Sequence, residues 1–160
     1  MLKIGDKAPN FLLEAANYGK DVQLTDFRGK SVVLFFYPKD ETPGCIKEVC
    51  SLRDNYQAIV SLNAVILGIN GDSVESHQSF SNNHNLTFPL LSDEDHKIAT
   101  EYGVWKEKKF LGKVTMGIER TTFIIDKEGF ISNVFSNVKP NGHGEEVYEY
   151  LKQLHELEEV

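Results

Sequence analysis

An apolar run of eight residues, Ser31 to Pro38 (SVVLFFYP), constrains the fold of this chain more than any other segment. A strand with one solvent-exposed face alternates polar and apolar residues, whereas an almost unbroken apolar run is typical of a strand buried on both faces. A second run of this kind, Asn63 to Asn70 (NAVILGIN), follows after a helix-length interval. Two buried strands separated in this way predict an α/β fold with right-handed crossover connections.

Strand-like and helix-like patterns alternate along the rest of the chain. We expect helices over 43–61, 73–84, 96–104 and 143–157, and strands over 21–27 (a strand or a turn), 31–38, 63–70, 87–93, 120–126 and 130–136. The last two strands flank Lys127-Glu128-Gly129, which is a hairpin signal. The pattern predicts a mixed sheet flanked by helices, in a single domain over residues 1–160.

Composition limits the partners of the chain. Its formal charge of -7 disfavours phosphate backbones, so we expect no nucleic-acid partner. Asp6, Lys7 and Pro9 interrupt what would be the apolar core of a signal peptide. No run approaches the ~18 apolar residues that span a bilayer. We therefore expect a soluble cytoplasmic protein with no membrane partner.

The two cysteines, Cys45 and Cys50, are five residues apart and follow the first buried strand. They are open to three interpretations: a metal-binding pair, a structural disulfide or a redox-active pair. A permanent disulfide is disfavoured in a reducing cytosol. A zinc site needs further ligands at short spacing, but the histidines are scattered, and we expect each to be a surface or capping residue. They are His77, His84, His96, His143 and His155. We predict no metal.

Cys45 lies in the first turn of a predicted helix. Thr42 is a favourable N-cap residue and Pro43 a favourable first helical residue, which makes Cys45 the third. The free N–H groups and the helix dipole there favour a thiolate. The Thr42 hydroxyl can hydrogen-bond the sulfur or the group it attacks, and Glu48 shares the face of Cys45 one turn later. The alternative is that Cys45 is a small buried apolar residue.

Cys50 has two open interpretations. Five residues along a continuous helix correspond to about 140° of rotation and roughly 7.5 Å of rise. Cα atoms farther apart than ~7 Å cannot be bridged without backbone movement. Either Cys50 is an ordinary core residue, or the helix opens to let the sulfurs meet.

Several motifs together resemble the peroxiredoxins. The stretch YPKDETPGC (37–45) resembles their active-site loop, and CIKEVC (45–50) is similar to the bacterioferritin comigratory protein, or peroxiredoxin Q, subgroup. The resemblance continues through GDKAPNFLL, GDSVESHQSF, FPLLSDEDHKIATEYGVW and GIERTTFIIDKEG, and so covers nearly the whole chain. The chain departs from the pattern at Ile46 and Val49, and at Asn70, where we expect a serine.

The resemblance implies a thioredoxin-like fold and a role for each matching residue. It implies Cys45 as the peroxidatic cysteine, Thr42 as the hydroxyl donor of the loop, Pro38 as the residue that shields the pocket, Arg120 as the active-site arginine, Glu48 as the acidic residue of the first helix, and Cys50 as the resolving cysteine that forms an intramolecular disulfide with Cys45.

The activity implied is that of a thiol peroxidase acting on hydrogen peroxide and organic hydroperoxides, without metal, haem or flavin. Thioredoxin or a similar dithiol would be the reductant. We expect a monomer, with a dimer as the alternative. One rival is a thioredoxin-like disulfide oxidoreductase, for which C-x-x-C would be expected rather than C-x-x-x-x-C. The other is a redox-sensing or holdase-type interaction protein that uses the same cysteine as a switch.

Overall fold

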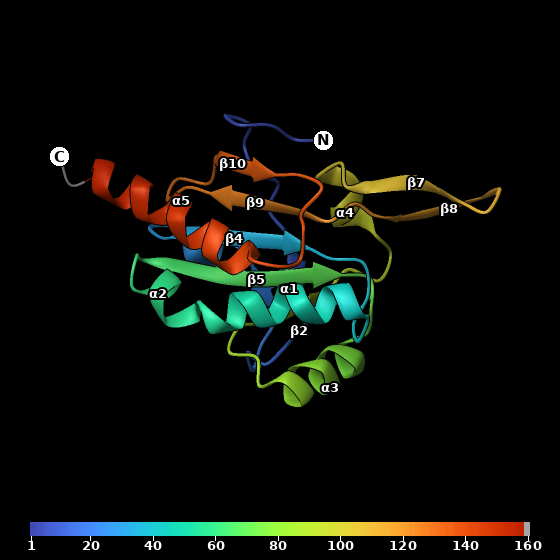
Figure 1. Cartoon of the computed structure of the whole chain (residues 1–160). Helices are drawn as coiled ribbons and strands as arrows, with labels where there is room; N and C mark the ends of the chain where they lie inside the picture. The colour runs from blue at the N-terminus through green and yellow to red at the C-terminus, as the bar shows by residue number, and fades with distance from the viewer. Residues whose placement is uncertain (159–160) are drawn as a thin grey trace.

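A computed structural model describes residues 1–158 and is built around a six-stranded mixed sheet (Figure 1). The strand order is β10-β9-β4-β5-β6-β2. The strands are β2 (Ala15–Ala16), β4 (Ser31–Phe36), β5 (Ala64–Asn70), β6 (Leu90–Ser92), β9 (Thr121–Ile125) and β10 (Ile131–Phe135). Strands β4, β5 and β6 are parallel, whereas β9 is antiparallel to β4. The predicted mixed α/β sheet is confirmed.

Helices and loops cover both faces of this sheet. The helices are α1 (Pro43–Asp54), α2 (Tyr56–Val60), α3 (Val74–His84), α4 (Lys97–Glu101) and α5 (His143–Glu158). Side chains of β4 alternate between two cores: Val33 and Phe35 pack with α1 and α5, whereas Leu34 and Phe36 pack with α4 and the N-terminal segment. All six residues of β4 are buried, as the apolar run predicts.

The helix predicted over 43–61 is two helices, so the prediction of one continuous helix is wrong. Asn55 ends α1 with non-helical dihedral angles, φ -100° and ψ 7°. Its side-chain amide donates to the carbonyl oxygen of Ser51 at 2.9 Å. Asparagine competes with the helix for backbone hydrogen bonds in this way, which accounts for the break.

The segment 21–27 forms a two-residue strand, β3 (Val22–Gln23), followed by the 3₁₀ turn η1 (Leu24–Phe27). Strand β3 pairs with β1 (Leu12–Leu13) outside the main sheet. The predicted hairpin over 120–136 is confirmed as β9 and β10. A further hairpin that the sequence pattern did not predict consists of β7 (Trp105–Phe110) and β8 (Lys113–Ile118), and it projects from the body of the molecule (Figure 1).

The remaining predicted helices are present: α3 and α4 are shorter than expected, whereas α5 covers the whole predicted range. Helix α3 begins after Ser73, whose hydroxyl accepts a hydrogen bond from the backbone N–H of Ser76. Helix α4 ends before Gly103, whose positive φ of 77° suits the left-handed position that follows a helix. Within residues 1–158, every helix is too short or too polar to cross a membrane.

Candidate active site

The candidate site lies where the chain leaves β4 and enters α1. Strands β4 and β5 are parallel and end at the same edge of the sheet, on the right in Figure 1. Because β9 is antiparallel to β4, with Thr121 opposite Phe36, β9 begins at this edge. This register brings Arg120, the residue before β9, close to the loop that carries Cys45, although 75 residues separate them in the chain.

Cys45 is the third residue of α1 and is fully buried as a free thiol. Pro43 is the first residue of the helix, as predicted. The positive end of the helix dipole therefore lies at the sulfur.

Arg120 is the charged partner of Cys45. Its Nη1 donates to Cys45 Sγ at 3.4 Å, and only 19% of its side chain is exposed. Gly44 allows this approach, because a Cβ at that position would lie 3.1 Å from Arg120 Nη2. A permanent cation at this distance stabilises negative charge on the sulfur.

Glu48 contacts the same nitrogen of Arg120 as the Cys45 sulfur does. Its Oε1 accepts from Arg120 Nη1 at 2.7 Å, and its other oxygen has no hydrogen-bond partner among the described residues. Burial raises the pKa of Glu48 to about 7, although the hydrogen bond and charge of Arg120 act in the opposite direction. Desolvation therefore outweighs the ion pair, and near neutral pH this carboxyl carries a proton much of the time.

Thr42 and Pro38 lie in the connecting loop. Thr42 occupies the N-cap position, but its hydroxyl donates to the carbonyl oxygen of Lys39 at 2.8 Å and makes no capping hydrogen bond. Thr42 is therefore the N-cap residue of α1, as predicted, and its hydroxyl proton is directed to the loop rather than to the Cys45 sulfur. Pro38 is half-buried and follows Tyr37 at the end of β4.

Cys50 lies on the same continuous helix as Cys45 and is partly exposed. It lines an open depression together with Ser51, with Gly142 immediately before α5, and with Glu145 in the first turn of α5. With α1 intact, the two sulfurs are held on different turns of one helix, as the spacing predicts.

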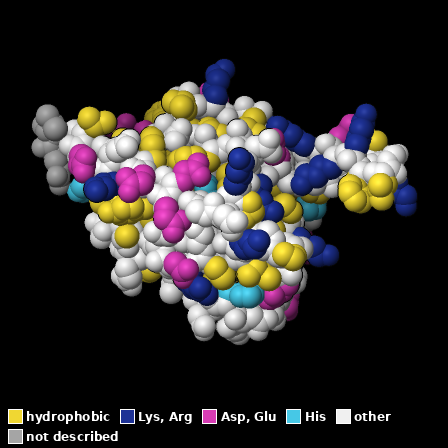
Figure 2. Space-filling model, in the orientation of Figure 1, with side chains coloured by type: hydrophobic (Ala, Val, Ile, Leu, Met, Phe, Trp, Pro, Cys, Tyr) yellow, Lys and Arg dark blue, Asp and Glu magenta, His cyan; other side chains and the backbone are white. Residues whose placement is uncertain are grey.

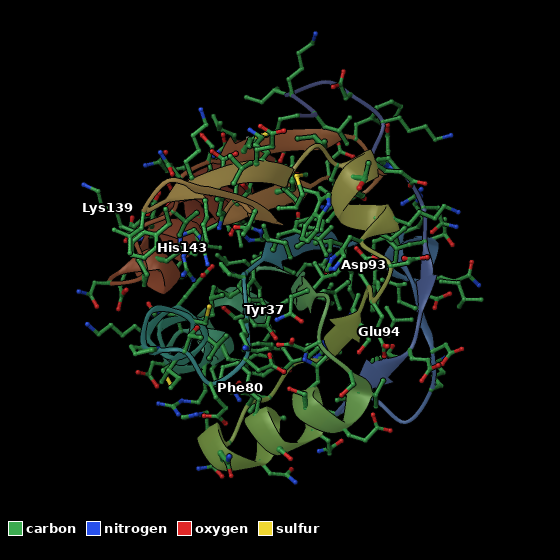
Figure 3. All side chains as sticks on the ribbon, turned by 90° about the vertical axis from the view of Figure 1, so that its right-hand side faces the viewer. Tyr37, Phe80, Asp93, Glu94, Lys139 and His143 are labelled. Carbon is green, nitrogen blue, oxygen red and sulfur yellow. The ribbon has the colours of Figure 1, made fainter. Side chains whose placement is uncertain are left out.

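Asp40, in the loop between β4 and α1, is the centre of a buried polar network that also includes residues of α3. Asp40 was not among the predicted site residues. Its carboxylate accepts from the Tyr37 hydroxyl at 2.6 Å and from the Ser76 hydroxyl at 2.8 Å, and it lies 2.7 Å from His77 Nδ1. Burial alone would raise the pKa of Asp40, but the hydrogen bond and charge of His77, together with Tyr37 and Ser76, hold it below its usual value. Figure 3 shows Tyr37 near the middle of the molecule, seen from the end that carries the site.

The network explains one departure from the peroxiredoxin pattern. Asn70 is fully buried at the end of β5, and its amide nitrogen lies 3.4 Å from Asp40 Oδ1 and 3.3 Å from Asp72 Oδ2. The backbone N–H of Asp40 donates to Asp72 Oδ2 at 2.8 Å. Asn70, at the end of β5, therefore helps to hold the loop that carries Asp40 in place. In the sequence, only the short spacing between Tyr37 and Asp40 indicates that these two side chains can interact.

Two histidines contradict the expectation of surface or capping positions. His77 is fully buried and its Nε2 donates to the carbonyl oxygen of Leu91 at 2.9 Å. His143 is also fully buried, at the start of α5 (Figure 3), with its Nε2 2.7 Å from the Thr122 hydroxyl. His96 occupies the N-cap position of α4 and stacks on Trp105. Residues 1–158 contain no cluster of three or more potential metal-ligating side chains.

Comparison with known proteins identifies relatives along the whole chain. The model of the AhpC/TSA family matches residues 4–134. Peroxiredoxin Bcp of Bacillus subtilis is 47% identical over 155 residues, covering 97% of this chain and 98% of the relative. Peroxiredoxin Bcp of Escherichia coli K12 is 44% identical over 152 residues, covering 95% and 97%.

Solved structures agree with these matches. The structure of a cysteine-to-serine mutant of PrxQ from Xylella fastidiosa aligns with a TM-score of 0.90 and 36% identity, covering 96% of this chain and 97% of that one. A bacterioferritin comigratory protein from Xanthomonas campestris aligns with a TM-score of 0.85 and 36% identity, covering 91% and 92%. The predicted thioredoxin-like fold and the predicted family are both confirmed, and the chain belongs to the AhpC/TSA family as a peroxiredoxin of the Bcp, or peroxiredoxin Q, type.

Proposed function

We propose that the chain reduces hydrogen peroxide and organic hydroperoxides through Cys45, with Cys50 as the resolving thiol and a thioredoxin-type dithiol as the reductant. The observation that carries the proposal is the 3.4 Å contact from Arg120 Nη1 to the Cys45 sulfur at the start of α1. The Xanthomonas campestris structure comes from work on the alkyl peroxide reduction activity of that protein, which supports the same substrate class here.

The first step breaks the O–O bond of the peroxide. The Cys45 thiolate attacks one oxygen, the S–O bond forms, and the other oxygen leaves as an alkoxide or hydroxide that takes up a proton. Cysteine is oxidised to sulfenic acid and the peroxide is reduced to an alcohol or water. Arg120 can stabilise the thiolate before the attack and the leaving oxygen after it, while Glu48 positions the guanidinium through the 2.7 Å hydrogen bond.

The second and third steps return the enzyme to its starting state. The Cys50 sulfur attacks the sulfenic sulfur of Cys45, water leaves, and an intramolecular disulfide forms. A dithiol reductant then exchanges with this disulfide through a mixed disulfide, so that both cysteines become thiols and the reductant becomes a disulfide. Residues Thr42 and Pro38 complete the pocket in this proposal, with the Thr42 hydroxyl oxygen facing the peroxide and Pro38 shielding the sulfur.

The test is peroxide consumption by the wild-type chain with a thioredoxin system, compared with Cys45→Ser. We expect repeated turnover by the wild type and none by Cys45→Ser, because a serine hydroxyl is not ionised near neutral pH. Near-wild-type activity in Cys45→Ser would remove Cys45 from the mechanism. A single stoichiometric oxidation without turnover would favour the sensor function over the enzyme. A monomeric, cytoplasmic protein remains our prediction.

A further inference from the structure

The β7–β8 hairpin is the part of the molecule that the peroxidase proposal leaves without a role. Among the described residues its two strands pair only with each other, and all side chains from 106 to 116 are exposed. The hairpin extends to the right in Figure 1, away from both cores. An isolated two-stranded hairpin adds little to the stability of a fold, so stability does not account for it.

The turn of the hairpin is apolar where folding favours a polar residue. Leu111 and Gly112 both have positive φ, 51° and 77°, as in a two-residue hairpin turn. Asn-Gly is the favoured sequence for such a turn, whereas leucine is disfavoured at positive φ. Leu111 is nevertheless 88% exposed, and Phe110 beside it is 75% exposed. Neither side chain contributes to a core, so the apolar tip suits contact with a partner.

Lysines surround this apolar tip. Residues directly opposite each other share a face, so Lys109 lies beside Val114 on one face and Phe110 beside Lys113 on the other. The strands carry four lysines and one glutamate, a formal +3, although the whole chain carries -7. Figure 2 shows hydrophobic side chains bordered by Lys and Arg at this projection. A basic, partly apolar projection complements a partner that is acidic and has an apolar patch.

The base of the hairpin leads directly into the active site. Strand β8 ends at Ile118, two residues before Arg120, whose Nη1 contacts Cys45 Sγ. Lys106 pairs with Glu119 at 2.6 Å, and Lys108 Nζ donates to the carbonyl oxygen of Ile118 at 2.5 Å. The hairpin therefore stands at the same end of the molecule as the start of α1 (Figure 1). A protein held by the hairpin would therefore lie at the end of the molecule that carries Cys45.

We propose that the β7–β8 hairpin is the docking surface for the protein reductant, an acidic dithiol protein with an apolar patch near its cysteines. This inference rests on the proposed function. The reductant must reach the Cys45–Cys50 disulfide, attack one of its sulfurs with a thiolate, and release the reduced enzyme with its second thiol. Position favours this partner over a bilayer or a second copy, because reduction requires a protein at this end of the molecule.

The test uses two hairpin variants that preserve the fold. Leu111→Asn creates the favoured Asn-Gly turn while removing the apolar tip. Lys109→Glu with Lys113→Glu reverses the charge of two side chains that have no hydrogen bond or ion pair among the described residues. Leu157→Asn and Lys152→Glu are matched controls, since both residues are exposed and lie toward the end of α5, on the opposite side in Figure 1.

We expect each hairpin variant to lower kcat/KM for a thioredoxin-type protein by at least ~10-fold, which corresponds to about 1.4 kcal/mol. Turnover supported by dithiothreitol, a small dithiol that needs no docking surface, should be unchanged, as should the rate of oxidation by peroxide. The wild-type kcat/KM for the protein reductant should fall as salt rises, and this dependence should weaken in the charge-reversal variant. The controls should behave as wild type.

Binding of the thioredoxin-type protein, followed by fluorescence anisotropy, separates this proposal from the peroxidase itself. A chain that consumes no peroxide but binds the protein through the hairpin refutes the function and keeps the docking surface. Unchanged binding and kcat/KM in both hairpin variants refute the docking surface. An equal loss with dithiothreitol indicates damage to the site and also refutes it. Adsorption to anionic vesicles, or a dimer lost in Leu111→Asn, with reductant kinetics unaltered assigns the hairpin to a membrane or a second copy instead.

Discussion

At the scale of single residues, one guanidinium nitrogen serves two groups. Arg120 Nη1 contacts Cys45 Sγ at 3.4 Å and Glu48 Oε1 at 2.7 Å. When Glu48 is ionised, it competes with the sulfur for the positive charge of Arg120. When Glu48 is protonated, the charge is left for the sulfur. The raised pKa of Glu48, caused chiefly by burial, therefore helps to keep Arg120 available to Cys45 near neutral pH.

Removing the guanidinium should slow the reaction with peroxide. We expect Arg120→Ala to lower the second-order rate of Cys45 oxidation by at least ~10-fold, about 1.4 kcal/mol, because both thiolate and leaving oxygen lose a cationic donor. Arg120→Lys should recover only part of the rate, since the planar fork is lost. Arg53→Ala is the control, because Arg53 contacts Asp54 and His84 instead of the cysteine. Stopped-flow measurement of an unchanged rate in Arg120→Ala would place the required charge elsewhere.

The buried carboxyl should make stability depend on pH. The folded-state pKa of Glu48, about 7, lies above its ordinary value of 4.5. The folded chain therefore keeps a proton that the unfolded chain releases between these values, and the free energy of unfolding falls as pH rises through this window, by about 3 kcal/mol in total. Below pH 4.5 the carboxyl is protonated in both states, and above about pH 7 it is ionised in both states, so the free energy of unfolding changes only within this window.

Glu48→Gln removes this titration while keeping an oxygen that can accept from Arg120. Between pH 5 and pH 8, the free energy of unfolding by urea should fall less in Glu48→Gln than in wild type. Glu149→Gln, at an exposed position on α5, should follow wild type. Identical pH dependence in wild type and Glu48→Gln would show that Glu48 titrates normally in the folded protein.

Local sequence predicts the residues near Cys45 better than the residues that support them. Pro43 and Cys45 follow from helix-start chemistry, and the structure places both where the sequence indicates. Asp40 could not be predicted in this way, because Ser76 and His77 reach it from α3. Thr42 is the N-cap residue, as predicted, but the acceptor of its hydroxyl proton, the Lys39 carbonyl three residues earlier, was not predicted.

At the scale of elements, α1 has to change shape for the proposed cycle to work. The helix is continuous through both cysteines, and its contact with α5 includes a hydrogen bond from Gly144 N to Ser51 Oγ at 2.8 Å. A Cβ on Gly144 would lie 2.2 Å from the Ser51 carbonyl oxygen, so the two helices approach closely there. Unwinding the first turns of α1 gives up several backbone hydrogen bonds, each worth a net ~1 kcal/mol, and the burial of Val49.

Hydrogen exchange should detect this change. Amides from Cys45 to Arg53 should be protected in the reduced protein and exchange rapidly in the oxidised protein, which should also be less stable to heat and protease. A Cys50→Ser variant treated with peroxide is the control, because it cannot form the intramolecular disulfide and should keep its protection. Equal protection of the oxidised and reduced wild type would leave Cys50 as a core residue, with Cys45 dependent on an external thiol.

Strands and helices with a buried face were predictable, whereas elements without one were not. The runs that became β4 and β5 are buried along almost their whole length. In the β7–β8 hairpin every side chain from 106 to 116 is exposed, so no burial pattern marks it in the sequence. The break at Asn55 was missed because the apolar stripe continues across it, with Leu52 and Ile59 both buried.

At the scale of the whole molecule, sheet topology assembles the site. The antiparallel placement of β9 beside β4 brings Arg120 to Cys45, and the parallel β5 brings Asn70 to Asp40. Physical reading of the sequence alone could predict the thiolate position but not its distant cation. Arg120 entered as a candidate through resemblance to the peroxiredoxins, and the structure places it in contact with the sulfur. A single domain over the chain remains a prediction.

In the proposed cycle, peroxide oxidises Cys45 and Cys50 then forms a disulfide with it. Peptide mass spectrometry after one equivalent of peroxide tests this directly. We predict that wild type loses two hydrogens as a Cys45–Cys50 disulfide, whereas Cys50→Ser carries one added oxygen, or further oxidation, at Cys45. Oxidation confined to Cys50, or a Cys45 sulfenic acid that persists in wild type beside a free Cys50, would rule out this cycle.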